Sequence, residues 1–253
     1  MRLTGIITFL AAFVMCGVSY ANDVYITQSG ATFNANINQD GTDNEMGDGD
    51  ADFTLSGDTH TLDIDQIGNT NTISGSITGD TQTLTLKQEG NGNTSTVNIG
   101  TNSSADDNAV TQTITGGSNT TTVNVGTSAA SGDADIDLTA TGDSNTVTIN
   151  ENSTATMIGD DKKVTNITLT GSSNTVTTTH AGAGDHDTTL AHTGSSGTFA
   201  ITQDGAGDSV VDMTTSGANH SVTITMDDYY SWFCIIFLYC YIDDIQFCVW
   251  CYW

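Results

Sequence analysis

The stretch Leu86–Gly100, LKQEGNGNTSTVNIG, contains two short runs in which apolar and polar residues alternate, joined by a cluster of Gly and Asn. Such alternation is typical of a half-buried β-strand, and Gly and Asn between two such runs indicate a tight turn. Similar stretches recur along the chain. A repeat of this length predicts a stacked architecture, because one pair of short strands cannot bury a core by itself.

Aligned on Gly-x-x-Asn, the copies define one unit of the repeat. The anchors stand 22 to 29 residues apart, and they are Gly41/Asn44, Gly68/Asn71, Gly90/Asn93, Gly116/Asn119, Gly142/Asn145 and Gly171/Asn174. Two degenerate copies follow, at Gly194/Gly197 and Gly217/His220. A second set of turn signals lies between the anchors, and the longer units grow mostly there. The pattern predicts an all-β fold: a β-solenoid of about eight strand-turn-strand-turn rungs, with loop insertions mainly on one edge.

Position within the repeat predicts which way each side chain points, because side chains on a strand alternate between its faces. The residue four before the anchor glycine and the residues five and seven after it are mainly aliphatic, as in Leu86 and Val97. Thr holds the opposite parity, as in Thr94 and Thr96, so we expect Thr-rich outer faces. The anchor asparagines tolerate a left-handed turn conformation and can bond to their copies, which predicts an asparagine ladder.

Composition divides the chain into three regions. Residues 1–21 combine Arg2, an apolar segment and small residues before Asn22, which predicts a secretory signal peptide. Residues 22–227 contain the repeats and have neither Cys nor Pro, so the predicted solenoid domain depends on backbone bonding and stacking. Residues 228–253 hold all three Trp and four of the five Cys. This abrupt change favours a tail that is not native coding sequence, with a membrane anchor and a Cys248/Cys251 pair as alternatives.

The charge of the chain narrows the range of partners. Thirty acidic residues against four basic ones give a formal net charge of −26. Nucleic acid and anionic membrane surfaces would repel such a chain, so we expect neither as a partner.

The first three anchors share a glutamine two residues before the glycine, at Gln39, Gln66 and Gln88. The resulting Gln-x-Gly-x-x-Asn motifs resemble curlin repeats, whose family forms curli, the functional amyloid of biofilm matrix. The resemblance implies a secreted protein, extracellular or at the cell surface, that self-associates into fibres for biofilm or adhesion. It also implies outer-membrane secretion and nucleation partners. The motif match covers about residues 22–100; beyond Gln88 the glutamine is replaced, and only the periodicity remains.

Elementary physics leads to a similar expectation without the family. A solenoid has two open ends with unpaired strand edges, and an uncapped edge can template the addition of another chain. The segment 22–39 begins with strand pattern and shows no polar or helical cap. Charge repulsion is the visible brake on such stacking, and it weakens with salt or with falling pH.

The Thr-x-Thr pairs suggest an alternative function. Parallel ranks of Thr on a flat solenoid resemble the faces of ice-binding proteins, so a monomeric ice-binding or surface-binding solenoid is the second hypothesis. Thr is also the ordinary small β-branched residue of an exposed strand. Both faces carry it, and Asp65, Lys87, Glu89 and Ala200 interrupt the ranks, which favours the ordinary reading.

Other chemistries have less support in the sequence. Asp48, Asp50 and Asp52 alternate as calcium ligands can, but no EF-hand loop is completed, which favours a solvated acidic loop. No constellation of nucleophile, base and orienting acid is evident, and no arginine follows residue 2. We therefore expect a structural protein, not an enzyme, with no cofactor and no metal.

Overall fold

The computed structural model describes residues 22–41, 43–47, 53–68, 70–79, 81–90, 92–99, 105–126, 131–152, 162–182, 185–205, 208–228 and 236–241. In these ranges the regular structure is entirely β-strand. Over the same residues, no helix is long and apolar enough to cross a membrane.

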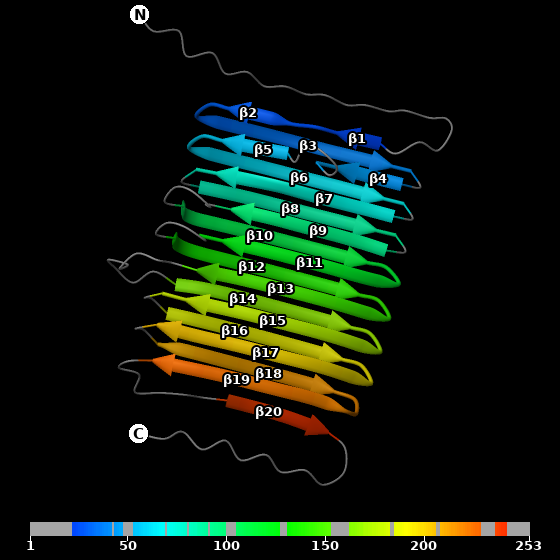
Figure 1. The fold of residues 1–253 in the computed structure, drawn as a ribbon, viewed down its shortest axis with the longest axis vertical. Helices are drawn as coiled ribbons and strands as arrows, with labels where there is room; N and C mark the ends of the chain where they lie inside the picture. Colours follow the sequence, from blue (N-terminus) through cyan, green and yellow to red (C-terminus); the bar gives the residue numbers. More distant parts are fainter. Residues whose placement is uncertain are drawn as a thin grey trace, which may run out of the picture.

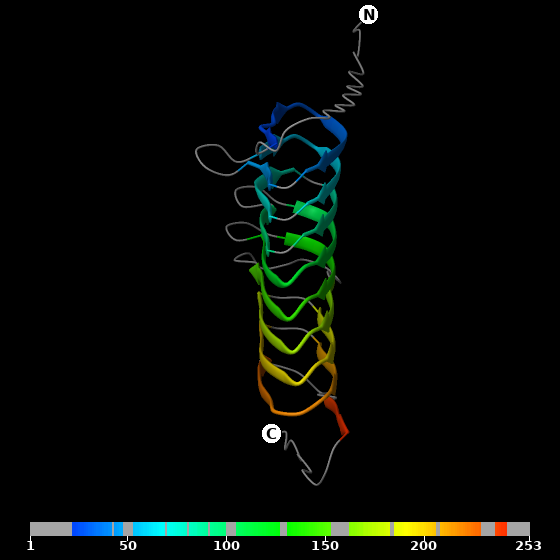
Figure 2. The same ribbon diagram turned by 90° about the vertical axis from the view of Figure 1, so that its right-hand side faces the viewer.

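The strands form two parallel sheets that face each other along a rod (Figures 1 and 2). Sheet A has 11 strands: β1 (Asn22–Val24), β2 (Thr27–Ser29), β4 (Asp43–Met46), β5 (Phe53–Ser56), β7 (Thr70–Thr78), β9 (Gly92–Ile99), β11 (Ser118–Val125), β13 (Ser144–Asn152), β15 (Ser173–Ala181), β17 (Ser196–Gly205) and β19 (His220–Asp228). Sheet B has nine: β3 (Thr32–Asp40), β6 (Thr59–Ile67), β8 (Thr81–Glu89), β10 (Ala105–Thr115), β12 (Ser131–Thr141), β14 (Lys162–Thr170), β16 (Asp185–Thr193), β18 (Ser209–Ser216) and β20 (Ile236–Tyr241).

The chain alternates between the sheets, so each rung contributes one strand to each. Among the described strands, seven rungs are unbroken, from β6 with β7 to β18 with β19. The rung of β3 has its sheet A strand divided into β4 and β5. The predicted β-solenoid of about eight rungs is therefore confirmed.

The register places equivalent positions of the repeat beside each other. Asn119 aligns with Asn93 on one side and with Asn145 on the other, and Asn145 aligns with Asn174. Sequence separations of 22 to 29 residues therefore become neighbouring strands without any slip. Such in-register pairing is expected because a slip of one residue would turn every aliphatic side chain to solvent.

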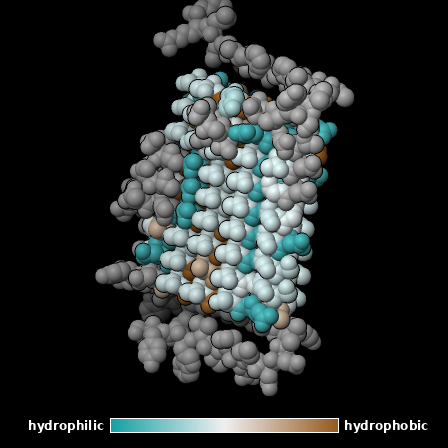
Figure 3. All heavy atoms as spheres, turned by 45° about the vertical axis from the view of Figure 1, so that its right-hand side comes forward, coloured by the Kyte–Doolittle hydropathy of each residue, from teal (hydrophilic) through white to brown (hydrophobic). Residues whose placement is uncertain are grey.

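Burial follows the predicted parity. Leu86, Leu138, Ile167 and Leu190, each four before an anchor glycine, are buried in sheet B. In sheet A the residues five or seven after the glycine are buried, and they include Ile73, Val97, Val123, Val147, Val176 and Phe199. The Thr residues of opposite parity lie on the outside, where Figure 3 shows columns of near-neutral hydropathy running along one face of the rod.

The two long edges of the rod differ. The anchor edge carries the Gly-x-x-Asn turns, and the opposite loop edge receives the insertions. Strands β9 and β11 end at the loop edge in register, with Ile99 beside Val125. The segments 100–104, 127–130 and 153–161 follow strands that end there and themselves lie outside the described residues. The predicted concentration of insertions on one edge is confirmed.

The acidic expansion after Asn44 lengthens one repeat within a strand and not at a turn. Met46 pairs with Ile73 and Phe53 pairs with Gly75, so the expansion interrupts a strand of sheet A opposite Ser74. Asp48, Asp50 and Asp52 lie outside the described residues. In the described ranges, no group of three or more His, Cys, Asp or Glu side chains could hold a metal ion.

The predicted boundary between the repeats and the tail falls within ordered strands. Strand β19 extends to Asp228, and β20 pairs in parallel with β18, for example Met213 with Leu238. The tail residues 236–241 thus continue sheet B. The proposed signal peptide, residues 1–21, lies outside the described residues.

Candidate functional site: the amide ladders and the open ends

The glutamines of the first three anchors form a buried ladder along the anchor edge. Gln66 Nε2 donates to Gln39 Oε1 at 2.7 Å, and Gln88 Nε2 donates to Gln66 Oε1 at 3.0 Å. Each amide also donates across the turn to a backbone carbonyl of its own rung, that of Glu45, Thr72 or Thr94. One side chain therefore ties neighbouring rungs together and also links the two sheets within a rung. Buried amides need such partners, because a buried unpaired polar group is costly.

The anchor asparagines bond in one way where the glutamine is present. Asn44 Nδ2 donates to the backbone oxygen of Gln39 at 2.9 Å and to that of Ile67, in the next rung, at 2.8 Å. Asn71 repeats the arrangement with Gln66 and Glu89, at 3.1 and 2.9 Å. In these rungs the ladder between side chains is made of glutamine, and the asparagine donates to backbone carbonyl groups.

From Asn93 onward the asparagines themselves form the ladder. Asn93 donates to Oδ1 of Asn119 at 2.9 Å, Asn119 to Asn145 at 2.6 Å, and Asn145 to Asn174 at 2.7 Å. The change coincides with the replacement of the glutamine by Ile114, which is buried. The expected ladder exists from Asn93 to Asn174, but glutamine forms the ladder in the earlier rungs. The alternation of inward and outward residues did not predict this change from glutamine to asparagine.

The conformational reason given above for the asparagines is wrong. Among the described residues, the only positive φ outside glycine is that of Asn219, at 62°. The anchor asparagines have ordinary backbone and point inward, with each side chain buried. Their side-chain amides, and not their tolerance of a left-handed turn, explain their presence.

The anchor glycines are required by the closeness of the rungs. A Cβ added at Gly68 would lie 1.7 Å from the backbone oxygen of Gly41, and one at Gly171 would lie 1.8 Å from that of Gly142. Because the obstacle is backbone in each case, no side-chain rearrangement can make room. The stacking distance therefore selects glycine at these turns.

The last repeats replace the amide ladder with aromatic contacts. The Phe199 ring occupies the space above Gly197, where a Cβ would lie 2.3 Å from Cζ of that ring. The His192 ring lies edge-on to Phe199, with ring centroids 5.0 Å apart, and to His220, with centroids 4.9 Å apart. The degenerate anchors of the sequence thus correspond to a different filling of the same edge.

The two ends of the solenoid are open. In the described part, β1 and β3 are the first strands of their sheets, and β19 and β20 are the last, so each pairs on one side only. The inward-facing residues of these rungs are half-buried, although they pack against the core; they are Val24, Ile26, Phe33, Ala35, Ile37 and Val222. Each end therefore presents core-type side chains beside unpaired backbone groups.

The two outer faces differ in charge. On sheet B the outward positions include Asp63, Asp65, Lys87, Glu89, Asp135, Asp137, Asp187 and Asp212. On sheet A the three central outward positions of each strand from β7 to β19 hold Thr, Ser or Asn, with Ala200 as the exception. Of the residues that interrupt the Thr ranks in the sequence, Asp65, Lys87 and Glu89 all belong to sheet B. Lys87 Nζ and Glu89 Oε1 form an exposed ion pair at 2.8 Å.

Comparisons with protein-family models, with curated proteins and with solved structures find no match to this chain.

Proposed function

We propose that this chain is a secreted structural subunit that stacks end to end into an extracellular, curli-like fibre. Its partners are then further copies of itself, together with outer-membrane components that secrete it and nucleate growth. In this proposal the chain has no catalytic role and needs no cofactor. The resemblance of the first repeats to curlin repeats motivates the family assignment, which is part of the proposal.

The open ends carry the proposal. The inward side chains of interior rungs, such as Ile64, are fully covered by the rungs above and below, whereas Ile26 and Ile37 of the first rungs are covered on one side only. A second copy placed in register would cover them and pair the free strand edges. Burial of apolar surface contributes about 25 cal/mol per Å², and paired edges remove unsatisfied backbone groups.

The in-register ladder supports stacking between molecules as it does within one. The glutamine amides donate toward the N-terminal end, from Gln88 to Gln66 to Gln39, whereas the asparagine amides from Asn93 to Asn174 donate toward the C-terminal end. Because the strands of both sheets pair in parallel, a copy that continues the sheets in register would add head to tail. Identical rungs stacked in parallel at about 4.8 Å are the defining geometry of cross-β fibres.

Seeded growth of the purified chain tests the proposal. We expect thioflavin-positive, unbranched fibres that seed fresh monomer. Ile37→Asp places a charge on the inward face of the first rung and should slow elongation strongly. Asn38→Asp adds the same charge to the exposed outer face of the same strand and should leave elongation nearly unchanged. A chain that stays monomeric, or an Ile37→Asp variant that elongates at the wild-type rate, would contradict end-to-end stacking.

A second function has a specific observation in its favour. The uncharged ranks of Thr on sheet A, on a chain of net charge −26, are suited to binding ice or another ordered surface as a monomer. The ranks repeat at about 4.8 Å between strands and about 6.8 Å along them, so hydroxyl and methyl groups form a flat lattice. A change in ice-crystal shape caused by the purified chain would support this function, and its absence would contradict it.

A further inference from the structure

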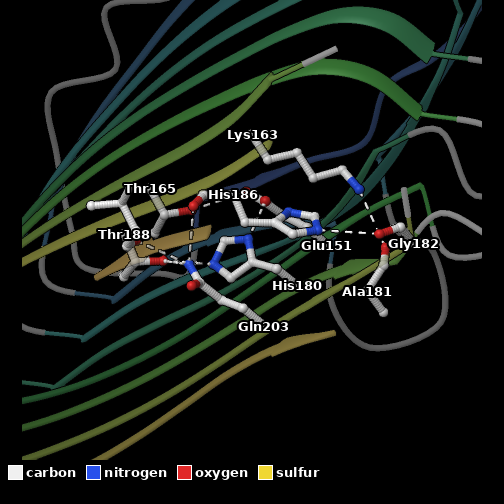
Figure 4. Close-up of polar contacts among 10 residues, drawn as sticks. Glu151, Lys163, Thr165, His180, Ala181, Gly182, His186, Thr188 and Gln203 are labelled. Atoms are coloured by element: carbon white, nitrogen blue, oxygen red, sulfur yellow. Dashed lines mark hydrogen bonds and ion pairs between the residues drawn. The ribbon is translucent and has the colours of Figure 1, made fainter. Parts of the chain in front are cut away.

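A cluster of ionisable and polar side chains lies inside the C-terminal half of the solenoid, next to the loop edge (Figure 4). It consists of Glu151, Lys163, Thr165, His180, His186 and Thr188, each at most 1% exposed. We call it the buried cluster. In earlier rungs the column of Glu151 and His180 is aliphatic, and it holds Ile77, Ile99 and Val125. The core thus changes from aliphatic to ionisable at β13.

The composition of the chain makes this placement unusual. The whole sequence has four Lys and Arg and five His. Lys163 is nevertheless in the core, and His180, His186, His192 and His220 all face inward in the same half. Buried ion pairs are often no more stabilising than apolar residues of similar size. Packing alone therefore does not explain why an aliphatic column becomes ionisable.

A directed chain of hydrogen bonds runs through the buried cluster. Gln203 Nε2 donates to Thr188 Oγ1 at 3.1 Å, and the Thr188 hydroxyl lies 3.1 Å from His180 Nε2. His180 Nδ1 lies 2.6 Å from Glu151 Oε2, and the Thr165 hydroxyl donates to Glu151 Oε1 at 3.0 Å. All contacts are satisfied when His180 is neutral, with its proton on Nδ1.

A second proton on the His186 ring would have no hydrogen-bond acceptor. Its Nε2 donates to the backbone oxygen of Gly182 at 3.2 Å, whereas its Nδ1 is buried without a hydrogen-bond partner. The charged groups around it are Lys163 on β14, His180 on β15 and Glu151 on β13, and Ser209 is its neighbour on β18. Burial, followed by Lys163 and His180, lowers the pKa of His186 to about 4, against the opposing effects of Gly182 and Glu151.

His192, at the anchor edge of the same strand, is in a similar position. Both of its ring nitrogens are buried without a partner. Its neighbours are Leu169 on β14, Thr215 on β18 and Phe199 on β17, and among the side chains that the structure describes His220 on β19 is the titratable group facing it. Burial, and then His220, lowers the pKa of His192 to about 4.

We propose that the rungs from β13 to β19 form an acid-sensitive segment. It is held together while the imidazoles of His186 and His192 are neutral, and it loosens when acid protonates them. Protonation would place a cation beside Lys163 in the buried cluster and an unpaired N–H group in the core at both edges. The described N-terminal rungs, with aliphatic and amide columns, have one histidine, His60, which is also buried, so acid should loosen them much less. The inference concerns one molecule and does not depend on fibre formation.

The direction of the pH effect follows from the pKa values. His186 and His192 have a pKa of about 4 in the fold, below the ordinary value of 6.5. The unfolded segment therefore binds more protons between these two values, and the segment loses stability as the pH falls from 6.5 towards 4. At pH 5 we expect the opening equilibrium to rise at least about tenfold relative to pH 7.5.

Segment-resolved hydrogen exchange of the full chain, at a concentration too low for association, tests the inference. After correction for intrinsic exchange rates, protection of β14, β16 and β18 should fall at least about tenfold between pH 7.5 and pH 5, whereas β7, β9 and β11 should change much less. Unchanged protection of the C-terminal strands at pH 5 would overturn the inference.

Substitutions drawn from the same columns show whether the histidines are responsible. His186→Asn copies Asn108, and His192→Leu copies its neighbour Leu169. The double variant should lose most of the pH dependence. His60→Gln, which copies Gln82, is the matched control and should leave the C-terminal loss intact. A double variant that keeps the full loss would overturn the inference. If it does not fold, the imidazole NMR signals of the wild-type chain decide: those of His186 and His192 should titrate below pH 5, and titration of both near 6.5 would exclude the mechanism.

Discussion

At the scale of single residues, the repeat motif is explained by the contact between rungs. The glycine leaves room for the backbone oxygen of the preceding rung, and the amides of Gln and Asn bond to their copies and to the backbone. Each residue type serves a contact with another rung 22 to 29 positions away. The motif is thus a stacking signal and not a local turn signal, which is why ordinary backbone angles are found at the asparagines.

Two glycines of neighbouring rungs form a matched pair of test sites. In Gly68→Ala the new Cβ would meet the Gly41 backbone oxygen at 1.7 Å, whereas a Cβ at Gly92 meets nothing within 4 Å. We expect Gly68→Ala to lower the free energy of unfolding by about 1–3 kcal/mol, as overpacking does. Gly92→Ala should change it by less than about 0.5 kcal/mol. Urea denaturation measures both, and equal effects would show that stacking distance does not select the anchor glycines.

At the scale of elements, the two sheets have the same inner pattern but different outer faces. Both bury aliphatic side chains at alternate positions, whereas the charged outward residues gather on sheet B. The sequence order interleaves the two sheets, so charged and uncharged strands alternate along the chain. This interleaving made the Thr ranks look interrupted, whereas the central outward positions of β7 to β19 on sheet A carry no charge; the outward charges of sheet A include Glu45 and Asp204, outside these positions.

A charge placed on each face separates the ice-binding hypothesis from ordinary Thr-rich strands. Thr146 is exposed on β13 of sheet A, and Thr139 is exposed on β12 of sheet B. If sheet A binds ice, Thr146→Lys should reduce ice-shaping activity severalfold, because a long charged side chain disrupts the flat rank. Thr139→Lys should leave the activity unchanged. Equal loss in both variants, measured by ice-crystal growth, would exclude sheet A as the specific binding face.

At the scale of the whole molecule, two features oppose each other. The rod has open ends that favour addition of further copies, and it has a net charge of −26 that disfavours their approach. A solenoid is held together mainly by contacts between neighbouring rungs, and each end rung has such contacts on one side only. Charge repulsion acts over about 10 Å at 0.1 M salt and is the adjustable term in this balance.

Salt should therefore accelerate fibre growth. Raising NaCl from about 10 mM to about 500 mM shortens the Debye length from about 30 Å to less than about 5 Å, which screens repulsion between stacked copies. We expect faster seeded elongation, followed by thioflavin fluorescence. KCl at the same ionic strength should accelerate elongation equally. Sucrose, which is uncharged and does not screen charges, should not produce this acceleration. Elongation that salt slows or leaves unchanged would show that charge repulsion does not limit fibre growth.

The sequence by itself determined the fold class, the rung count, the inward and outward positions and the edge of the insertions, because parity and period are properties of consecutive residues. Which outer face is charged, the change from Gln to Asn ladder and the buried cluster were decided by the tertiary structure. These features depend on contacts between residues 14 to 29 positions apart, such as Thr165 with Glu151 and His180 with Glu151. Extending the parity from Val147 to Glu151 would have marked one buried charge. The partners of that charge are set only when the rungs stack.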